Sequence, residues 1–382
     1  MFGRMVGDFL VLGGGIAGAS AGYFLARSGK VLLLEREVAL GYHSTGRSAA
    51  LFSEYYGGAA VRALTAASRS FFTAPPAGFG ASVVRARPVV ALCPVGSEER
   101  FAAVLADGRT APTPVREIGP AELQQLCPIV RPHWYSRAML KPATMDIDVH
   151  AVHQGFVRGI RARGGEVVTS ARVRELSRQG DHLWRAITDR GEFLAPVVLN
   201  AAGAWADELA GLADVRRIGL VPKRRTAALV AGPPGVSVAD WPMVADVTET
   251  FYFKPESGGL LASPMDETPV PAGDVRPDDL DVAVAVERIE ACTTLVIRHI
   301  RTAWAGLRSS VADDVPVIGE APGTPGFFWL AALGGYGIQT APAAGRLAAD
   351  LVTSARTRDS YLAIGIDPAE LAPGRLESEP AI

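Results

Sequence analysis

The feature that most constrains this chain is a glycine-rich turn that follows a short apolar run near the N-terminus. Residues Phe9–Leu12 are all apolar, which is typical of a strand buried on both faces. Gly13, Gly15 and Gly18 follow in the G-x-G-x-x-G spacing. The first glycine permits a tight turn, the second lets a pyrophosphate approach the backbone, and the third lets a helix pack closely on the strand.

The residues after this turn complete a strand–helix–strand pattern. Residues 19–26 predict a helix that Gly29 ends, and residues 31–34 predict a second buried strand that leads to Glu35. The helix N-terminus supplies unpaired N–H groups for phosphates, and Glu35 can accept hydrogen bonds from a ribose 2′-hydroxyl. A glycine-rich loop that only packs is the alternative. Because strand, glycines, helix, strand and acid occur in register, the sequence favours a dinucleotide-binding site.

The overall composition is that of an ordinary soluble enzyme. At 382 residues the chain is long enough for two domains, each with its own core. A formal net charge of −2 provides no basic field for nucleic acid or anionic lipid. No apolar run is long enough to span a membrane. We interpret the apolar N-terminus as core rather than as a signal peptide, because its glycines stand where a phosphate-binding turn needs them.

The cysteines and histidines do not suggest a metal site. Cys93, Cys127 and Cys292 are far apart in the sequence and form no C-x-x-C motif, which argues against zinc and disulfides and favours the reducing cytoplasm. His150 and His153 lie in a predicted helix at residues 148–163, without a third ligand spaced to join them. We therefore expect them on the helix surface and predict no metal.

A polar segment punctuated by glycines, GYHSTGRSAA, covers residues 41–50. Ser44, Thr45, Arg47 and Ser48 can donate hydrogen bonds to a phosphate or to a ring edge. The alternative is a solvated loop in which Ser48 caps the helix-like residues 48–56. The spacing supports both interpretations equally.

Motifs throughout the chain resemble those of a known superfamily. They are GGGIAGAS, LEREV, GYHSTGRSAA, RALTAASR, PPAGF, HQGFVRGIR, LNAAGAWAD, PKRR, DWPM, FYFKP, AWAGLRS and GGYGIQT. Together they resemble the FAD-dependent D-amino acid oxidases and dehydrogenases, and within that superfamily the bacterial D-arginine dehydrogenases. The resemblance extends to about residue 362. It implies an α/β fold of the D-amino acid oxidase and glutathione reductase-2 type, with a Rossmann-like FAD-binding domain and a second domain of mixed β-sheet and helices.

On this basis we expect a discontinuous FAD-binding domain made of residues 1–80, 141–218 and 306–365. Residues 81–140 and 219–305 are expected to form the substrate-binding domain, including a helix at residues 289–300. The last segment, residues 366–382, is expected to be a disordered tail.

The resemblance implies that the cofactor is FAD, and we predict that it is bound without a covalent link. No cysteine lies near the C-terminal glycine cluster, and His43 is the one residue that could form a histidyl bond. In the superfamily the N–H groups that correspond to Gly334, Gly335, Gly337 and Ile338 face the flavin edge where reduction leaves negative charge. This second glycine cluster favours FAD over NAD, because a plain NAD enzyme needs no distant loop that returns to its dinucleotide. The expected cofactor-binding residues are Gly13, Gly15, Ile16, Ala17, Gly18, Glu35, Arg36, Ser44, Thr45, Arg47, Ser48, Ala49, Val173, Ala202, Gly203, Trp205, Gly334, Gly335, Tyr336, Gly337, Ile338 and Gln339.

The expected catalytic residues are Arg225, Arg308, Tyr56, Tyr252 and Gly335. An arginine stays charged and presents a planar fork to a carboxylate, so motif matching assigns Arg225 and Arg308 to the head group of an amino acid. Structural ion pairs are the alternative for both. Tyr56 and Tyr252 match tyrosines that cover the substrate in the resembling enzymes, and a role as core aromatics is the alternative.

Two positions depart from the D-arginine dehydrogenase pattern. Val89 stands where that enzyme has a glutamate, and Leu51 stands where it has a histidine. A cationic side chain would be desolvated there without a partner. We therefore predict a D-amino acid with an apolar side chain, such as leucine, methionine or phenylalanine. Glu54 or Asp246 is the alternative source of a charge-recognising acid.

The resemblance implies oxidative deamination of an amino acid by hydride transfer from Cα to flavin N5. The resulting imino acid hydrolyses to a 2-oxo acid. An oxidoreductase for N-methyl or secondary amino acids, or for 2-hydroxy acids, is the alternative on the same scaffold. A flavin-binding protein with a sensory or structural role is the non-enzyme alternative. The sequence leaves the electron acceptor, oxygen or a quinone, undetermined.

Overall fold

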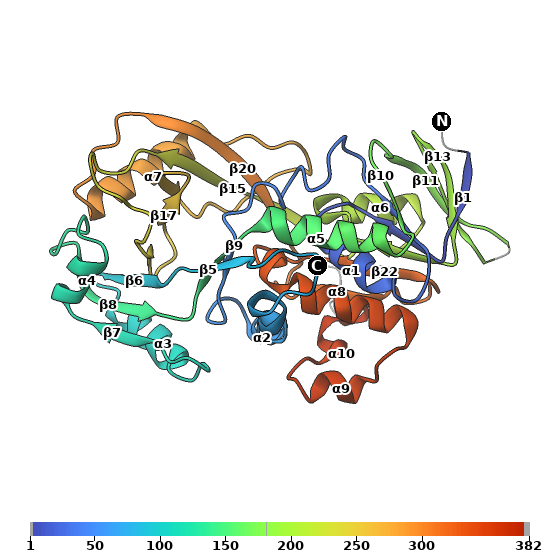
Figure 1. The fold of residues 1–382 in the computed structure, drawn as a ribbon, viewed down its shortest axis with the longest axis horizontal. Coiled ribbons are helices and arrows are strands. Elements are labelled where there is room, and N and C mark those ends of the chain that lie inside the picture. The colour runs from blue at the N-terminus through green and yellow to red at the C-terminus, as the bar shows by residue number, and fades with distance from the viewer. Residues whose placement is uncertain (1–2, 181, 378–382) are drawn as a thin grey trace.

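The computed structural model describes residues 3–180 and 182–377, and a six-stranded sheet forms its centre (Figure 1). All neighbouring strands of this sheet are parallel except the last pair. β2 and β3 are buried over their whole length, as their uniformly apolar sequences predict. The order across the sheet is β10 (Glu166–Val168), β3 (Val31–Leu34), β2 (Phe9–Leu12), β14 (Val197–Asn200), β22 (Phe327–Ala331) and β21 (Val317–Glu320).

The helices that cover this sheet are α1 (Ile16–Leu25), α2 (Ala59–Thr73), α5 (Val149–Ala162) and α8 (Gly337–Thr353). α1 packs against both α5 and α8, and α2 packs on α8. Small residues allow the closest of these contacts. A Cβ added at Gly345 of α8 would lie 2.5 Å from the Ser20 hydroxyl on α1, so the two helices could not approach as closely with a larger residue.

A larger mixed sheet forms the other half of the molecule, at the left in Figure 1. The helices on this side are α3 (Glu98–Gly108), α4 (Pro120–Leu126) and α7 (Asp279–Cys292). The strands, in order, are β19 (Thr268–Pro269), β15 (Val221–Val230), β18 (Gly259–Ser263), β17 (Tyr252–Glu256), β16 (Met243–Asp246), β6 (Val89–Pro94), β8 (Tyr135–Lys141) and β7 (Arg116–Ile118), with β20 (Ile300–Ser310) paired to β15.

Two smaller sheets and several short helices complete the described fold. A four-stranded sheet contains β1 (Arg4–Val6), β13 (Gly191–Ala195), β12 (Trp184–Thr188) and β11 (Val173–Arg178). A three-stranded sheet contains β4 (Leu51–Phe52), β9 (Met145–Ile147) and β5 (Val84–Ala86). The remaining helices are η1 (Gly203–Trp205), α6 (Ala206–Leu212), α9 (Arg358–Leu362), α10 (Pro368–Leu371) and η2 (Pro373–Glu377).

The structure confirms the expected α/β class, in which a Rossmann-like sheet is combined with a second mixed sheet. The division into two domains at the stated residues stays a prediction. Its boundary at residue 306 falls inside β20, which continues in the large sheet to Ser310. No helix in the described ranges is both long enough and apolar enough to cross a membrane.

Two expected helices are wrong. The segment at residues 48–56 contains β4 and turns, because Leu51 and Phe52 pair with Asp146 and Met145 of β9. The helix expected at residues 289–300 ends at Cys292, and β20 begins at Ile300. Both errors arise from pairing with distant strands, which local sequence patterns do not encode.

The expectation of a disordered tail at residues 366–382 is wrong as far as residue 377, and residues 378–382 lie outside the described residues. α10 and η2 pack on the six-stranded sheet beside β21. Ile366 and Leu371 are buried, and the Arg375 guanidinium pairs with Asp313 at 2.8 Å. Ile366 and Leu371 therefore anchor a segment that was expected to be disordered.

Candidate active site

One cavity lies between the carboxyl ends of the parallel strands and a face of the large sheet. Ligands of open α/β sheets bind at such strand ends. The cavity is lined by almost all of the residues predicted for cofactor and substrate. The exceptions are Gly18, which lies beneath the turn, and Tyr336. The fold thus brings the predicted residues together, while the role of each one stays a prediction.

The turn after β2 has the shape of a phosphate cradle. Gly13 has φ +110°, and a Cβ there would lie 2.4 Å from the Ala201 carbonyl oxygen. A Cβ at Gly18 would lie 1.9 Å from the Gly13 carbonyl oxygen. Gly15 is the N-cap residue of α1 and supplies no capping side chain. The first N–H groups of α1 therefore face the cavity end of the helix, where the helix dipole favours an anion.

Glu35 lies directly after β3 and holds the turn in place. Its Oε2 accepts a hydrogen bond from Gly14 N at 2.8 Å, and its Oε1 accepts one from Glu37 N at 2.9 Å. Burial raises the pKa of the Glu35 carboxyl, and these two N–H donors oppose that rise. Since each carboxylate oxygen has two lone pairs, Glu35 retains acceptor capacity for a ribose hydroxyl.

Three of the four polar side chains predicted as donors in the loop at residues 41–50 make contacts within the protein, while Ser48 is exposed. The Ser44 hydroxyl donates to the Leu307 carbonyl at 2.7 Å, and the Thr45 hydroxyl accepts from Ile16 N at 3.0 Å. Arg47 donates to the carbonyl oxygen of Ala305 and pairs with Asp274. The side chains therefore attach the loop to β20 and α1, which fixes one wall of the cavity.

The expectation that His153 lies on a helix surface is wrong. His153 is buried, and its Nε2 lies 2.9 Å from the Gly14 carbonyl oxygen beneath the glycine turn. Burial lowers the pKa of its imidazole. His150 is exposed, as expected. Among residues 3–180 and 182–377, no group of three or more His, Cys, Asp or Glu side chains could hold a metal ion.

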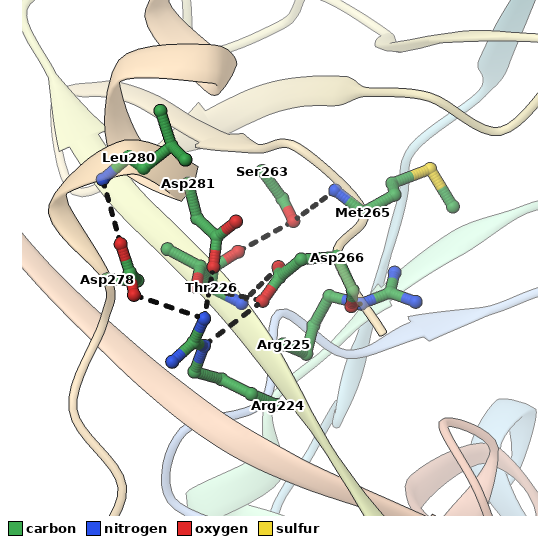
Figure 2. A network of polar contacts seen from close by, with 9 residues as sticks. All are labelled: Arg224, Arg225, Thr226, Ser263, Met265, Asp266, Asp278, Leu280 and Asp281. Atoms are coloured by element: carbon green, nitrogen blue, oxygen red, sulfur yellow. Dashed lines mark hydrogen bonds and ion pairs between the residues drawn. The ribbon is translucent and has the colours of Figure 1, made fainter. Parts of the chain in front are cut away.

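Arg225 and Arg224 point to opposite faces of β15 (Figure 2). Arg224 pairs with Asp281 and Asp278 near the start of α7. Arg225 lines the cavity, where its Nε donates to the Asp266 carbonyl at 2.8 Å and its Nη2 pairs with Glu267 at 2.6 Å. The Arg225 Nη1 is buried and has no partner in the described part of the chain. Arg225 therefore combines a structural ion pair with one unused donor.

Arg308 on β20 is the second cation of the cavity. Its Nη1 donates to the Tyr56 hydroxyl at 3.1 Å, and no carboxylate of the described residues pairs with it. Burial first, and then the nearby Arg308 cation, lower the pKa of the Arg225 guanidinium. Arg308 without an acid, together with the unused Arg225 Nη1, forms a site that can bind an anion.

Gly335 creates the space that Arg308 occupies. A Cβ at this position would lie 2.3 Å from the Arg308 Nη1 and 2.4 Å from its Cζ. The Tyr56 and Tyr336 rings meet edge to face at 4.9 Å on the same side of the cavity. Tyr252 on β17 also lines the cavity.

One of the four N–H groups expected to face the flavin is already occupied. Gly334 N donates to the Ser309 carbonyl at 3.0 Å, so only Gly335, Gly337 and Ile338 retain that predicted role. Gly337 and Ile338 begin α8, where the first N–H groups have no partner within the helix. Gln339 is buried and bridges Ser53 and Thr65 through its side-chain amide.

The family model described as "FAD dependent oxidoreductase" (DAO) matches residues 8–351. This chain belongs to that family. The human mitochondrial dimethylglycine dehydrogenase is 24% identical over 373 residues, which cover 90% of this chain and 42% of the relative. The glycine oxidase of Pseudomonas aeruginosa is 32% identical over 225 residues, which cover 55% of each chain. The chain thus spans less than half the length of the dimethylglycine dehydrogenase that it matches.

Solved structures support the fold of this FAD-dependent oxidoreductase. Glycine oxidase from Geobacillus kaustophilus superposes with a TM-score of 0.84 at 20% identity, covering 99% of this chain and 100% of that one. L-proline dehydrogenase from P. horikoshii has a TM-score of 0.85 at 20% identity, covering 98% of both chains. These structural comparisons show the fold, and neither the family model nor the relatives named above single out D-arginine dehydrogenase within the superfamily.

The cavity fits FAD, the cofactor of the family. The steric limits at Gly13 and Gly18 leave a backbone cradle for the pyrophosphate, and Glu35 stands where the adenosine ribose is expected. Trp205 and Arg36 extend this wall, with the Arg36 guanidinium 4.7 Å from the Trp205 ring centre.

Sequence reasoning missed Lys141, Met243 and Glu249, which also line the cavity. Met243 ends the DWPM motif without having been assigned to the site, and no quoted motif contains Lys141 or Glu249. Lys141 reaches the cavity because it stands opposite Val89 in the β6–β8 pair, a register that appears only in the folded sheet.

Proposed function

We propose that this FAD-dependent oxidoreductase oxidises the Cα–N bond of an amino acid. The observation that carries the proposal is the half-buried Arg308 guanidinium, which lines the cavity and has Tyr56 as a partner but no acid within ion-pairing distance in the described chain. Arg225 adds one unused donor in the same cavity. An α-carboxylate would satisfy both cations and fix the substrate's head group.

The chain's own residues bind and orient this substrate. Arg308 and Arg225 hold the carboxylate, and Tyr56 and Tyr252 limit the space around the amine and Cα. FAD, when bound, accepts the hydride from Cα. The amine enters in its neutral form, so the step needs no strong protein base. The imino acid that forms takes up water and releases ammonia and a 2-oxo acid.

The narrower proposal is a D-amino acid whose side chain makes apolar contacts. Leu51, Val89, Met243 and Ala245 all line the cavity and offer hydrocarbon surface. The two alternative acids are engaged elsewhere. Glu54 pairs with Arg69, and Asp246 accepts hydrogen bonds from the turn that follows β16. Neither Glu54 nor Asp246 is therefore free to pair with a guanidinium side chain, which disfavours D-arginine.

A second candidate is a secondary or N-methyl amino acid. It is favoured by the relatives of this chain, which include dimethylglycine dehydrogenase and sarcosine dehydrogenase. Both candidates need the same carboxylate anchors. They differ in the substituent on nitrogen.

Anaerobic mixing of FAD-loaded enzyme with single compounds separates these candidates, because flavin reduction removes the yellow absorbance. We expect D-leucine, D-methionine or D-phenylalanine to bleach the flavin much faster than D-arginine. Faster bleaching by N-methylglycine or N,N-dimethylglycine would replace the first candidate with the second. If no amino acid, N-methyl amino acid or 2-hydroxy acid bleaches it, the sensory or structural alternative holds.

A further inference from the structure

The cavity is also lined by Lys141, whose strand lies far from the arginine pair in the order of the large sheet. Lys141 ends β8, and its partner across the strand pair is Val89 of β6. Val89 in turn stands opposite Met243 of β16. Directly opposed residues point to the same face of a sheet, so the three side chains share the face that lines the cavity.

Lys141 has no ion-pair partner within 4.0 Å among the described residues, although acids stand nearby. Asp107 on α3 is paired with Arg62 on α2 at 2.8 Å. Asp246 is satisfied by hydrogen-bond donors from Thr250. Arg100, also on α3, adds another positive charge close by.

Glu249 is the remaining acid near Lys141, and it is exposed at the cavity rim. Its backbone has φ +56°, in the region that favours glycine, which fixes the turn that carries it. Burial lowers the pKa of the Lys141 ammonium, and Glu249 opposes that effect without forming an ion pair. Lys141 therefore lines the cavity as an ammonium that no neighbouring acid of the described chain pairs with.

We propose that this end of the cavity is a second anion subsite, in which Lys141 binds a carboxylate at the tip of the substrate's side chain. The inference rests on the proposed function and refines it. The stem of the side chain lies against Val89 and Met243, which keeps the apolar contacts already proposed. Lys141 also repels a cationic group at the end of a substrate side chain. D-arginine is therefore disfavoured by this repulsion, and Glu54 and Asp246 are not free to pair with it. The substrate class is a D-amino dicarboxylic acid with a hydrocarbon stem.

Two matched compounds test the subsite in the FAD-loaded enzyme. D-2-aminoadipate and D-norleucine have the same stem, and they differ in a terminal carboxylate against a methyl group. We expect kcat/KM to favour D-2-aminoadipate by at least about tenfold in the wild type, and Lys141→Met to reverse the preference. Lys141→Arg should retain it. Lys30→Met, which removes an exposed lysine on the far side of the fold, should leave the ratio unchanged.

Binding without turnover provides a second measurement. Adipate should bind the wild type more tightly than hexanoate by titration calorimetry, and Lys141→Met should remove the difference. Glu249→Gln should maintain or strengthen adipate binding, because it removes a competing acid. If Glu249→Gln weakens binding as Lys141→Met does, the two residues form a structural pair and the proposal is wrong.

The outcomes separate the two levels of inference. A wild type that oxidises D-norleucine faster than D-2-aminoadipate, or a ratio that Lys141→Met does not change, overturns the subsite and leaves the proposed function intact. If neither these two compounds nor any other amino acid bleaches the flavin, the proposed function fails and the subsite fails with it.

Discussion

Arg308 shows how a single residue defines the chemistry of this cavity. It is half-buried in the cavity wall, and in the described chain its guanidinium donates to Tyr56 but meets no carboxylate. Arg308→Ala should raise the activation free energy of kcat/KM for a carboxylate substrate by about 2–5 kcal/mol, because the substrate carboxylate then lacks its cationic partner. FAD content, read from the ratio of flavin to protein absorbance, should not change. Arg301→Ala, an exposed arginine on the same strand, is the matched control. Wild-type kcat/KM in Arg308→Ala would make the arginine structural.

A substitution at Gly335 provides a second test of the role of Arg308 in substrate binding. Gly335→Ala places a methyl group 2.3 Å from the Arg308 Nη1, so the guanidinium must move. We expect a rise in KM comparable to that of Arg308→Ala, with little loss of FAD. Gly58→Ala meets no atom within 4 Å and should behave as wild type. An unchanged KM in Gly335→Ala would contradict the position of Arg308 described here.

His43 is the residue on which covalent attachment of FAD depends. Its Nε2 lies 3.0 Å from Glu37, and its ring lies 4.5 Å from that of Trp205. We predict that FAD is bound without a covalent link. Acid precipitation of the purified enzyme should release the yellow colour into the supernatant. Colour that stays with the pellet would show a covalent bond.

At the scale of elements, the C-terminal segment contributes stability that its composition conceals. Leu371 of α10 is 1% exposed, whereas Leu362 of α9 is 44% exposed. Leu371→Ala should lower the free energy of unfolding by about 2–5 kcal/mol, since it leaves a cavity beneath the sheet. Leu362→Ala should change it by less than about 0.5 kcal/mol. Urea denaturation of both variants gives the comparison. Equal free energies of unfolding for the two variants would mean that this segment is disordered, as expected from the sequence.

The elements that sequence predicted well are those whose signals are local. β2, the glycine turn, α1 and β3 follow one another, so apolar runs and glycine spacing suffice. β4 was missed because its two residues become a strand only by pairing with β9. The end of α7 was misplaced for a related reason: Ile300 belongs to β20, whose register is set by β15.

At the scale of the whole molecule, the cavity joins residues that are distant in the sequence. The glycine turn and both arginines could be found through motifs. Lys141 could not, because its position follows from the register with Val89 in the large sheet. His153 was misassigned because the Gly14 carbonyl that it contacts belongs to another layer of the fold. Sequence motifs therefore identified the residues around the cofactor better than the residues around the proposed substrate side chain.

The most direct test of the central claim compares an amino acid with the amine that lacks its carboxylate. We expect kcat/KM to be higher for the amino acid by a factor of about 30 or more. This corresponds to about 2–5 kcal/mol of additional transition-state stabilisation. Arg308→Ala should remove most of this difference, because the carboxylate then loses its anchor. The measurement is flavin reduction by D-leucine and by 3-methylbutylamine under anaerobic conditions, with wild type and variant side by side. Equal rate constants for the two compounds in the wild type would contradict the assignment of the arginine pair to a substrate carboxylate.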